Sequence, residues 1–198
     1  MVCKLTPSAP RLILFAGHAG TGKSTLAKQA LPLIIEKTGE DFFFLDKDTV
    51  YGAFSAHVME LTTQNPNDRD SPFYLENLRD WEYQGLIDIA KENLLLGVNV
   101  ILVGPFSREI QSGLMFDAQA LGVPPQTTIQ IAWIDLDVSE AKKRMRKRAD
   151  PRDEWKLAHW DQYVIRRTEP PTHALLHRFD NSAFNEVSFE KLIDDLVR

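Results

Sequence analysis

Apolar residues in this chain gather in short runs that alternate with longer stretches of helical spacing. The short runs predict five strands, at 12–16, 42–45, 98–103, 128–136 and 175–179. The stretches between them predict helices at 23–37, 73–96, 108–121, 138–149, 154–168 and 189–198. Strands that alternate with helices favour a parallel sheet covered on both faces. We therefore predict a three-layer α/β/α fold with a central parallel sheet of about five strands.

The length of 198 residues suits one domain spanning 1–198. Within it, the mixed segment 49–72, whose second half is rich in Asn, Asp and Pro, is a candidate acceptor-binding insert. The segment 138–160, which carries a basic helix, is a candidate lid.

Composition narrows the class of protein. The formal charge of −5 argues against a general nucleic-acid binder. The single cysteine, Cys3, cannot form an internal disulfide, as expected in a reducing cytosol. The apolar run 12–16 is too short for a signal core or a membrane span. We expect a cytoplasmic protein without a membrane anchor; its oligomeric state is open.

The most specific motif lies between the first predicted strand and the first predicted helix. It fits the pattern G-x-x-x-x-G-K-[ST] and reads Gly17-His18-Ala19-Gly20-Thr21-Gly22-Lys23-Ser24, with Thr25 following. Glycines let backbone N–H groups turn toward a phosphate, and the helix N-terminus adds partial positive charge. Lys23 is suited to the β- and γ-phosphates, and the Ser24 hydroxyl to Mg²⁺. The motif predicts binding of ATP with Mg²⁺.

Two carboxylates follow the second predicted strand. Asp46 and Asp48 flank Lys47, at the strand end where ligands of open parallel sheets bind. A carboxylate there can accept a hydroxyl proton, orient the acceptor or hold a water on Mg²⁺. The alternative is that one or both cap a helix starting near Thr49. The residue pattern does not decide which aspartate is the base.

The predicted helix 138–149 is strongly basic, with six cations in the seven residues 142–148. Arg144 and Arg148 are four residues apart and share one helix face, which suits neutralisation of a transferring phosphoryl group. The alternatives are a solvated charged face and a nucleic-acid contact, although the run lacks aromatic residues for base stacking.

These elements, in this order, resemble the P-loop small-molecule kinases. That group includes shikimate and gluconate kinases, chloramphenicol phosphotransferase, zeta-type toxins and the kinase domain of polynucleotide kinase. The resemblance covers Leu12 to about Trp160. It implies an acceptor-side aspartate, which looks like Asp46 by the chloramphenicol phosphotransferase pattern and Asp48 by the polynucleotide kinase pattern. It also implies lid arginines at Arg144 and Arg148, and Asn181 in the adenine-side loop.

One departure from the family concerns the metal site. The third predicted strand ends Val103-Gly104-Pro105, without the acid that many P-loop proteins place there for Mg²⁺. Asp46 or a water is left to complete the metal shell with Ser24. Asp135, at the end of the fourth predicted strand, is an alternative acid and would indicate a different P-loop class.

The sequence favours an ATP-dependent kinase that transfers the γ-phosphate to a hydroxyl of a small molecule. A P-loop switch or ATPase and a polynucleotide 5′-kinase are the alternatives. Ser107 and Arg108 are candidate acceptor contacts, as are aromatic side chains of the insert and the helix after it: Tyr51, Phe54, Phe73, Tyr74 and Trp81. The identity of the acceptor is not encoded in any motif.

Overall fold

The computed structural model describes residues 9–198, so Cys3 lies outside the described residues. Its centre is a sheet of five strands in the order β2-β3-β1-β4-β5, and every neighbouring pair is parallel. The strands are β1 (Arg11–Ala16), β2 (Phe42–Asp46), β3 (Asn99–Val103), β4 (Thr128–Asp135) and β5 (Leu176–Asp180). The predicted fold class is confirmed, and each strand lies within two residues of its predicted bounds.

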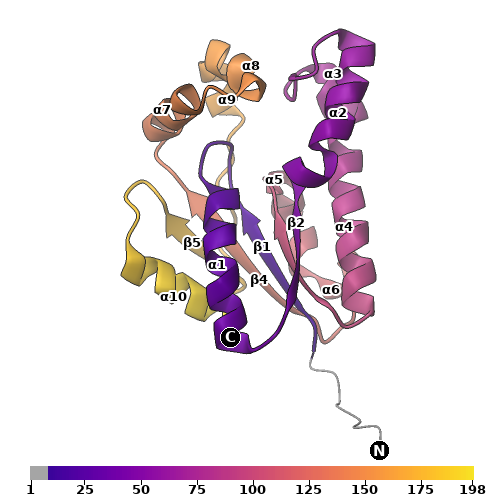
Figure 1. The fold of residues 1–198 in the computed structure, drawn as a ribbon, viewed down its shortest axis with the longest axis vertical. Helices are drawn as coiled ribbons and strands as arrows, with labels where there is room; N and C mark the ends of the chain where they lie inside the picture. Colours follow the sequence, from indigo (N-terminus) through magenta and orange to yellow (C-terminus); the bar gives the residue numbers. More distant parts are fainter. Residues whose placement is uncertain (1–8) are drawn as a thin grey trace, which may run out of the picture.

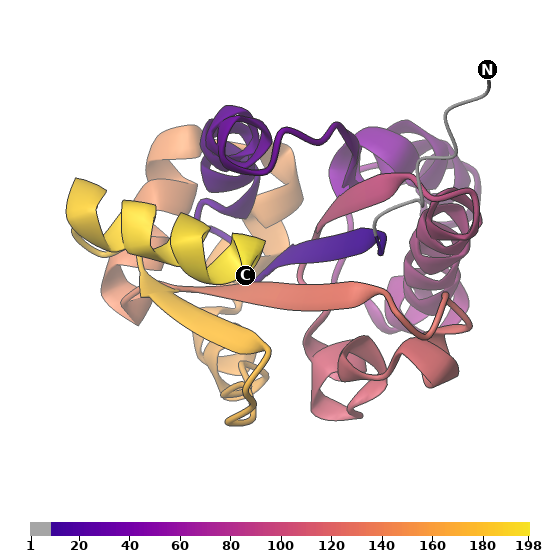
Figure 2. The same ribbon diagram turned by 90° about the horizontal axis from the view of Figure 1, so that it is seen from below.

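Helices cover both faces of the sheet. On one face lie α1 (Lys23–Thr38) and α10 (Glu186–Val197); on the other lie α4 (Arg79–Leu95), α5 (Ser107–Gln111) and α6 (Ala118–Leu121), as Figures 1 and 2 show. Successive residues of β1 alternate between the two cores. Leu12 and Leu14 pack in the α4 core, whereas Ile13 and Phe15 pack in the α1 and α10 core. This explains why the strand has an unbroken apolar sequence.

The remaining helices lie beyond the carboxyl ends of the strands (Figure 1). The insert 49–72 is mostly helical, because α2 spans Lys47–Thr63, and α3 spans Pro72–Asn77. The predicted lid 138–160 forms α7 (Val138–Arg148), the 3₁₀ turn η2 (Pro151–Asp153), α8 (Glu154–Ala158) and the start of α9 (Trp160–Ile165). Among residues 9–198, no helix has the length and apolar character that crossing a bilayer demands.

The predicted helix 73–96 is wrong in one respect, since the chain breaks at Leu78 into α3 and α4. A continuous helix would separate the Cα atoms of Tyr74 and Glu82 by about 12 Å along its axis. The break brings them together, and the Tyr74 hydroxyl donates to Glu82 Oε2 at 2.7 Å. Trp81, one of the aromatic residues considered as acceptor contacts, is 75% exposed.

Two further predicted helices are also interrupted. The segment 108–121 divides at Gly113, whose φ of 85° ends the helix, into α5, the 3₁₀ turn η1 (Leu114–Phe116) and α6. The segment 154–168 divides at His159, whose backbone leaves the helical region between α8 and α9. Short-range spacing does not reveal these breaks, because the apolar positions on each side stay in phase.

Candidate active site

The loop 17–25 runs from the end of β1 into α1, beneath the lid (Figure 1). Two of its glycines are required by geometry. Gly17 has a φ of 135°, and a Cβ there would lie 2.4 Å from the Ile134 carbonyl oxygen. Gly22 caps α1 with a φ of 90°, and a Cβ there would lie 2.8 Å from Asn181 Nδ2. The loop therefore tolerates no side chain at these positions.

Hydrogen bonds from buried polar side chains fix the loop from inside. The Thr21 hydroxyl donates to the His18 carbonyl oxygen at 3.0 Å, and Asn181 Nδ2 donates to the Thr21 carbonyl oxygen at 2.8 Å. The His18 ring packs edge-on against Trp133, and its Nε2 lies 2.9 Å from the Thr168 carbonyl oxygen. Burial lowers the pKa of His18 to about 4, so the ring is neutral at pH 7 and donates through Nε2.

Lys23 is placed at the start of α1 with its ammonium group facing the loop. Its Nζ donates to the His18 carbonyl oxygen at 2.7 Å. Burial lowers the pKa of Lys23 to about 8, although Asp48 and Asp46 oppose that shift. The charged form of Lys23 is disfavoured by desolvation, so an anionic group bound beside its ammonium would stabilise it.

Asp46 and Asp48 have different environments. Asp46 ends β2, is 6% exposed, and its Oδ1 accepts from the Asp48 backbone N–H at 2.9 Å, so it caps α2. Asp48 stands in the first turn of α2, 3.2 Å from Lys47 Nζ and 3.3 Å from Arg152 Nη1. Burial would raise the pKa of Asp48, but Lys47 and Arg152 outweigh it and lower the pKa, which keeps the carboxylate ionised.

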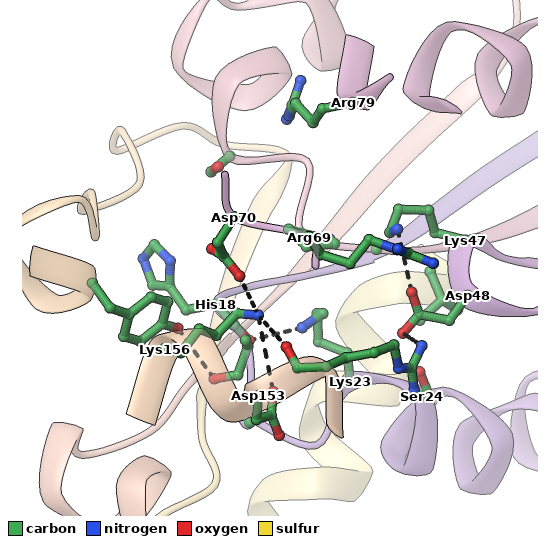
Figure 3. A pocket seen from close by; sticks show the side chains of 18 of the residues that line it. His18, Lys23, Ser24, Lys47, Asp48, Arg69, Asp70, Arg79, Asp153 and Lys156 are labelled. Carbon is green, nitrogen blue, oxygen red and sulfur yellow. Dashed lines mark hydrogen bonds and ion pairs between the residues drawn. The ribbon is translucent and has the colours of Figure 1, made fainter. Parts of the chain in front are cut away.

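One cavity of about 370 Å³ joins the loop, the strand ends, the insert and the lid (Figure 3). Its lining includes ten lysines and arginines but only four aspartates. The predicted residues among the lining are His18, Ala19, Gly20, Gly22, Lys23, Ser24, Thr25, Asp46, Asp48, Ser107, Arg108, Arg148 and Tyr74. The structure thus brings Lys23, Ser24 and both aspartates to one space.

The lid is joined to the insert by ion pairs over this cavity. Lys156 Nζ lies 2.7 Å from Asp70 Oδ2, and Arg166, just after α9, lies 3.3 Å from Asp70 Oδ1. Arg152 supplies the second connection, to Asp48. Below, the Tyr163 hydroxyl donates to the Ala19 carbonyl oxygen at 3.4 Å. Residues of the predicted lid and of the segment after it therefore contact the loop 17–25, the start of α2 and the predicted insert.

Arg144 and Arg148 share a face of α7 but have different partners. Arg148 lines the cavity and pairs with Asp153. Arg144 stands outside the cavity lining; its Nη2 donates to the Asn181 carbonyl oxygen at 2.7 Å, and its Nη1 lies near Gly22. Arg144 and Asn181 therefore lie behind the loop, on the side of β5.

The alternative metal acid, Asp135, is engaged elsewhere. Both of its carboxylate oxygens accept from Arg178 on β5, at 2.7 and 2.9 Å, and Trp133 Nε1 donates to it at 3.1 Å. Asp135 is not among the residues that line the cavity. Of the carboxylates considered from sequence, only Asp46 and Asp48 face the same space as Ser24.

The sequence patterns missed a buried polar cluster between α2, α3 and α4. Glu82 on α4 accepts from Lys47 Nζ at 2.9 Å, from the Tyr74 hydroxyl and from the Ser55 hydroxyl. Glu82 is 2% exposed. The sequence signal for this cluster is the charge of Glu82 at a helix position that faces the core.

Removal of Glu82 is expected to destabilise the fold. In Glu82→Ala, Lys47 keeps only Asp48 as a carboxylate partner, and the Tyr74 and Ser55 hydroxyls lose their acceptor. We expect the free energy of unfolding in urea to fall by about 3–5 kcal/mol. The matched control Glu92→Ala, at an exposed site of the same helix, should cost less than about 0.5 kcal/mol. A loss below about 1 kcal/mol in Glu82→Ala would contradict the cluster's structural role.

Comparisons with known proteins agree with this architecture. A family model described as an AAA domain matches residues 12–171. A search of curated protein sequences finds no match.

Solved structures of two kinases and of Kti12 share the fold. The chain is similar to Mycobacterium tuberculosis APS kinase CysC in complex with AMPPNP and APS, with 16% identity, a TM-score of 0.61, and 97% of this chain and 100% of that chain covered. It is similar to Chaetomium thermophilum Kti12 in complex with ADP-AlF3, with 16% identity, a TM-score of 0.62, and 94% and 97% covered. It is also similar to a sugar kinase from Janibacter sp. HTCC2649, with 19% identity and a TM-score of 0.56; the match covers 95% of this chain and 91% of that chain. The predicted P-loop fold is confirmed.

Proposed function

Because the chain belongs to the AAA_33 family of AAA domains, we propose that it is an ATP-dependent phosphotransferase that moves the γ-phosphate to a hydroxyl group of a small molecule. The observation that carries the proposal is the shared cavity, in which Lys23 and Ser24 of the phosphate loop face Asp46, Asp48 and the lid's Arg148. The structural neighbours support it, because one is an APS kinase in complex with AMPPNP and APS, and another is Kti12 in complex with ADP-AlF3.

The phosphate loop provides the nucleotide side of the reaction. Backbone N–H groups of residues 18–24 and the N-terminus of α1 surround the triphosphate. Lys23 exchanges its bond to the His18 carbonyl oxygen for the β- and γ-phosphates, and this contact favours its charged form. Arg148 and Arg152 face the transferring group from the lid and balance charge on its equatorial oxygens.

Mg²⁺ fits the oxygen ligands at this site. Ser24 and Asp46 line the cavity together, and Mg²⁺ is usually held by one or two protein oxygens, waters and substrate phosphates. When bound, the ion neutralises charge that develops on the phosphate oxygens. Ser24 would ligate the ion through its hydroxyl. Asp46 would hold a water bound to the ion, while Asp46 Oδ1 keeps its hydrogen bond from the Asp48 backbone N–H at the start of α2.

Asp48 is the proposed base on the acceptor side. The acceptor oxygen bonds to the γ-phosphorus as the bond from that phosphorus to the β,γ-bridging oxygen breaks, and ADP leaves with the electron pair. The hydroxyl proton passes to the Asp48 carboxylate, which the nearby Lys47 and Arg152 keep ionised. Asp48 is favoured over Asp46 because Asp46 is committed to the helix cap.

The test of the proposed function is a screen of hydroxyl compounds with MgATP, in which ADP release is measured above the rate without acceptor. At least one compound should accelerate ADP release and appear phosphorylated by mass spectrometry. ADP release that no hydroxyl compound changes would instead favour a P-loop ATPase or switch.

The affinity for MgATP should fall at high pH because Lys23 must be charged to hold the phosphates. The free protein's Lys23, with a pKa of about 8, is mostly protonated at pH 7 and mostly neutral at pH 9. We expect the association constant to fall about tenfold between pH 7 and pH 9, with proton uptake on binding above pH 8. Calorimetry in buffers of different ionisation enthalpy measures the association constant and the proton uptake. An affinity that is constant between pH 7 and pH 9 would contradict the assignment of Lys23 as the cation that holds the phosphates.

A further inference from the structure

Three cations line the proposed acceptor side of the cavity, and one carboxylate partner of each lies outside the lining. Lys47, Arg79 and Arg108 line the cavity, whereas Glu82, Glu109 and Asp80 do not. Lys47 pairs with Glu82 beneath it, and both Nη atoms of Arg79 pair with Glu109, at 2.5 and 2.9 Å. A molecule bound here meets guanidinium and ammonium groups whose partners Glu82, Glu109 and Asp80 lie outside the lining. Asp48, which also pairs with Lys47, is a carboxylate that lines the cavity beside them.

Arg69 differs from Lys47, Arg79 and Arg108 because, among the described residues, no carboxylate lies within ion-pair distance of it. Its Nη1 donates to the carbonyl oxygens of Pro66 and Asp68 at 3.0 and 2.9 Å, and its Nη2 to that of Gly52 at 3.1 Å. Within residues 9–198, no Asp or Glu oxygen lies within 4.0 Å of its guanidinium. Those bonds use three of the five N–H donors of an arginine, which leaves two for a ligand. The side chain lines the same cavity as Lys47 and Asp48 (Figure 3).

The insert holds Arg69 in position by several independent contacts. Asp68 Oδ1 accepts from the backbone N–H groups of Asp70 and Ser71 at 2.9 and 2.8 Å, which closes the loop. The guanidinium carbon lies 5.7 Å from the centre of the Tyr74 ring. The next residue, Asp70, is 8% exposed and is clamped by Lys156 and Arg166 from the lid side. A cation held this firmly, without a carboxylate, is preorganised for an anion.

The volume and the remaining lining of the cavity limit the size of the acceptor. The cavity of about 370 Å³ must also admit the γ-phosphate, so the acceptor is small. Tyr74, Leu75 and Tyr83 supply a short apolar wall, and Arg108, with a 54% exposed side chain and one bond to Asp80, adds a second reachable guanidinium.

We propose that the acceptor is a small hydroxyl compound with a second group that is anionic, either a phosphate or a carboxylate. Arg69 and Arg108 bind this anionic group. This inference rests on the proposed function. The anionic group lies against these arginines while the hydroxyl reaches Asp48. MgATP remains the phosphoryl donor, and the transfer of bonds and proton is the one given above.

The first test measures anion binding without turnover. The protein is saturated with MgAMPPNP, so that the phosphate loop is filled, and inorganic phosphate is titrated by calorimetry. Wild-type protein should bind phosphate. Arg69→Gln should weaken that binding at least tenfold, and Arg108→Gln, at an exposed side chain, at least threefold. The matched control Arg146→Gln, on the exposed face of α7 outside the cavity, should leave it unchanged. Absent phosphate binding, or equal binding in wild type and Arg69→Gln, overturns the proposal.

The second test measures transfer to matched acceptors: glycerol with glycerol 3-phosphate, and glucose with glucose 6-phosphate and gluconate. The charged member of a pair should be preferred at least tenfold in kcat/KM. Arg69→Gln should raise its KM without changing the KM for ATP, and Arg69→Lys should restore part of the loss. Preference for the neutral members, or for a 5′-hydroxyl oligonucleotide, overturns the proposal while the phosphotransferase function stands. Arg69-dependent phosphate binding without transfer to any hydroxyl supports the anion site and counts against the proposed function.

Discussion

Lys23→Met is expected to lower MgATP turnover by about 10²–10³-fold, the loss that follows removal of one preorganised charge donor from a transition state. The ammonium group is the one cation of the phosphate loop 17–25, and its present partner is only a carbonyl oxygen of the same loop. Methionine keeps the length of the side chain and removes the charge. Calorimetry with MgATP and steady-state ADP release measure the binding and catalytic losses separately.

The same substitution should not weaken the fold. The pKa of Lys23 is lowered from its ordinary value of 10.5 to about 8, so the folded protein disfavours the charged form and gains no stability from it below pH 8. We therefore expect the Tm of Lys23→Met to be equal to or above that of the wild type. Lys28→Met, at an exposed position of α1, is the matched control and should change neither quantity. Full MgATP affinity in Lys23→Met would refute the nucleotide site.

Local sequence patterns predicted the parts of the site that depend on neighbours in the chain. The loop 17–25 is determined by glycines whose backbone angles no other residue adopts easily, and its strand and helix follow directly. Asp46 and Asp48 were placed correctly at the strand end because parallel strands of an open sheet direct their carboxyl ends to one edge. The alternative role of Asp46 as a helix cap was also predicted, because the residue stands just before a helix.

The proposed acceptor side depends on pairs that are distant in sequence, and no spacing rule encodes them. Asp70 meets Lys156 and Arg166, and Lys47 meets Glu82, across separations of 35 residues or more. Each partner alone resembles an ordinary surface charge. The break at Leu78 was missed for a related reason, since it serves the contact between Tyr74 and Glu82 and not the helix pattern.

Helical periodicity predicted the positions of the two lid arginines on α7 but not their contacts. A shared face correctly described Arg144 and Arg148 as neighbours on α7. The face is wide enough, however, that Arg148 lines the cavity while Arg144 is held behind the loop by Asn181. Arg152, in the turn after α7, faces Asp48 across the cavity. A phosphate-contacting role for Arg144 remains a prediction, and its distance from Gly22 makes an effect on the loop the more direct expectation.

Asp48→Asn is expected to lower kcat by about 10²–10⁴-fold, the range for loss of a positioned proton acceptor. The amide keeps the size of the side chain but cannot take the hydroxyl proton. Because Asp48 lies on the acceptor side and outside the loop, the dissociation constant for MgATP should change by less than about threefold. Single-turnover kinetics with the best acceptor from the screen, together with MgATP calorimetry, separate the two quantities.

Asp46→Asn is the matched substitution that distinguishes the two aspartates. Asparagine is as good a helix cap as aspartate, so α2 should keep its first turn and the fold its stability. The variant loses the negative charge beside Ser24. This loss should raise the Mg²⁺ concentration that gives half-maximal rate, whereas kcat at saturating Mg²⁺ should stay within about tenfold of the wild type. The reverse pattern, in which Asp46→Asn abolishes transfer at any Mg²⁺ concentration and Asp48→Asn does not, would assign the base to Asp46 and reduce Asp48 to a partner of Lys47 and Arg152.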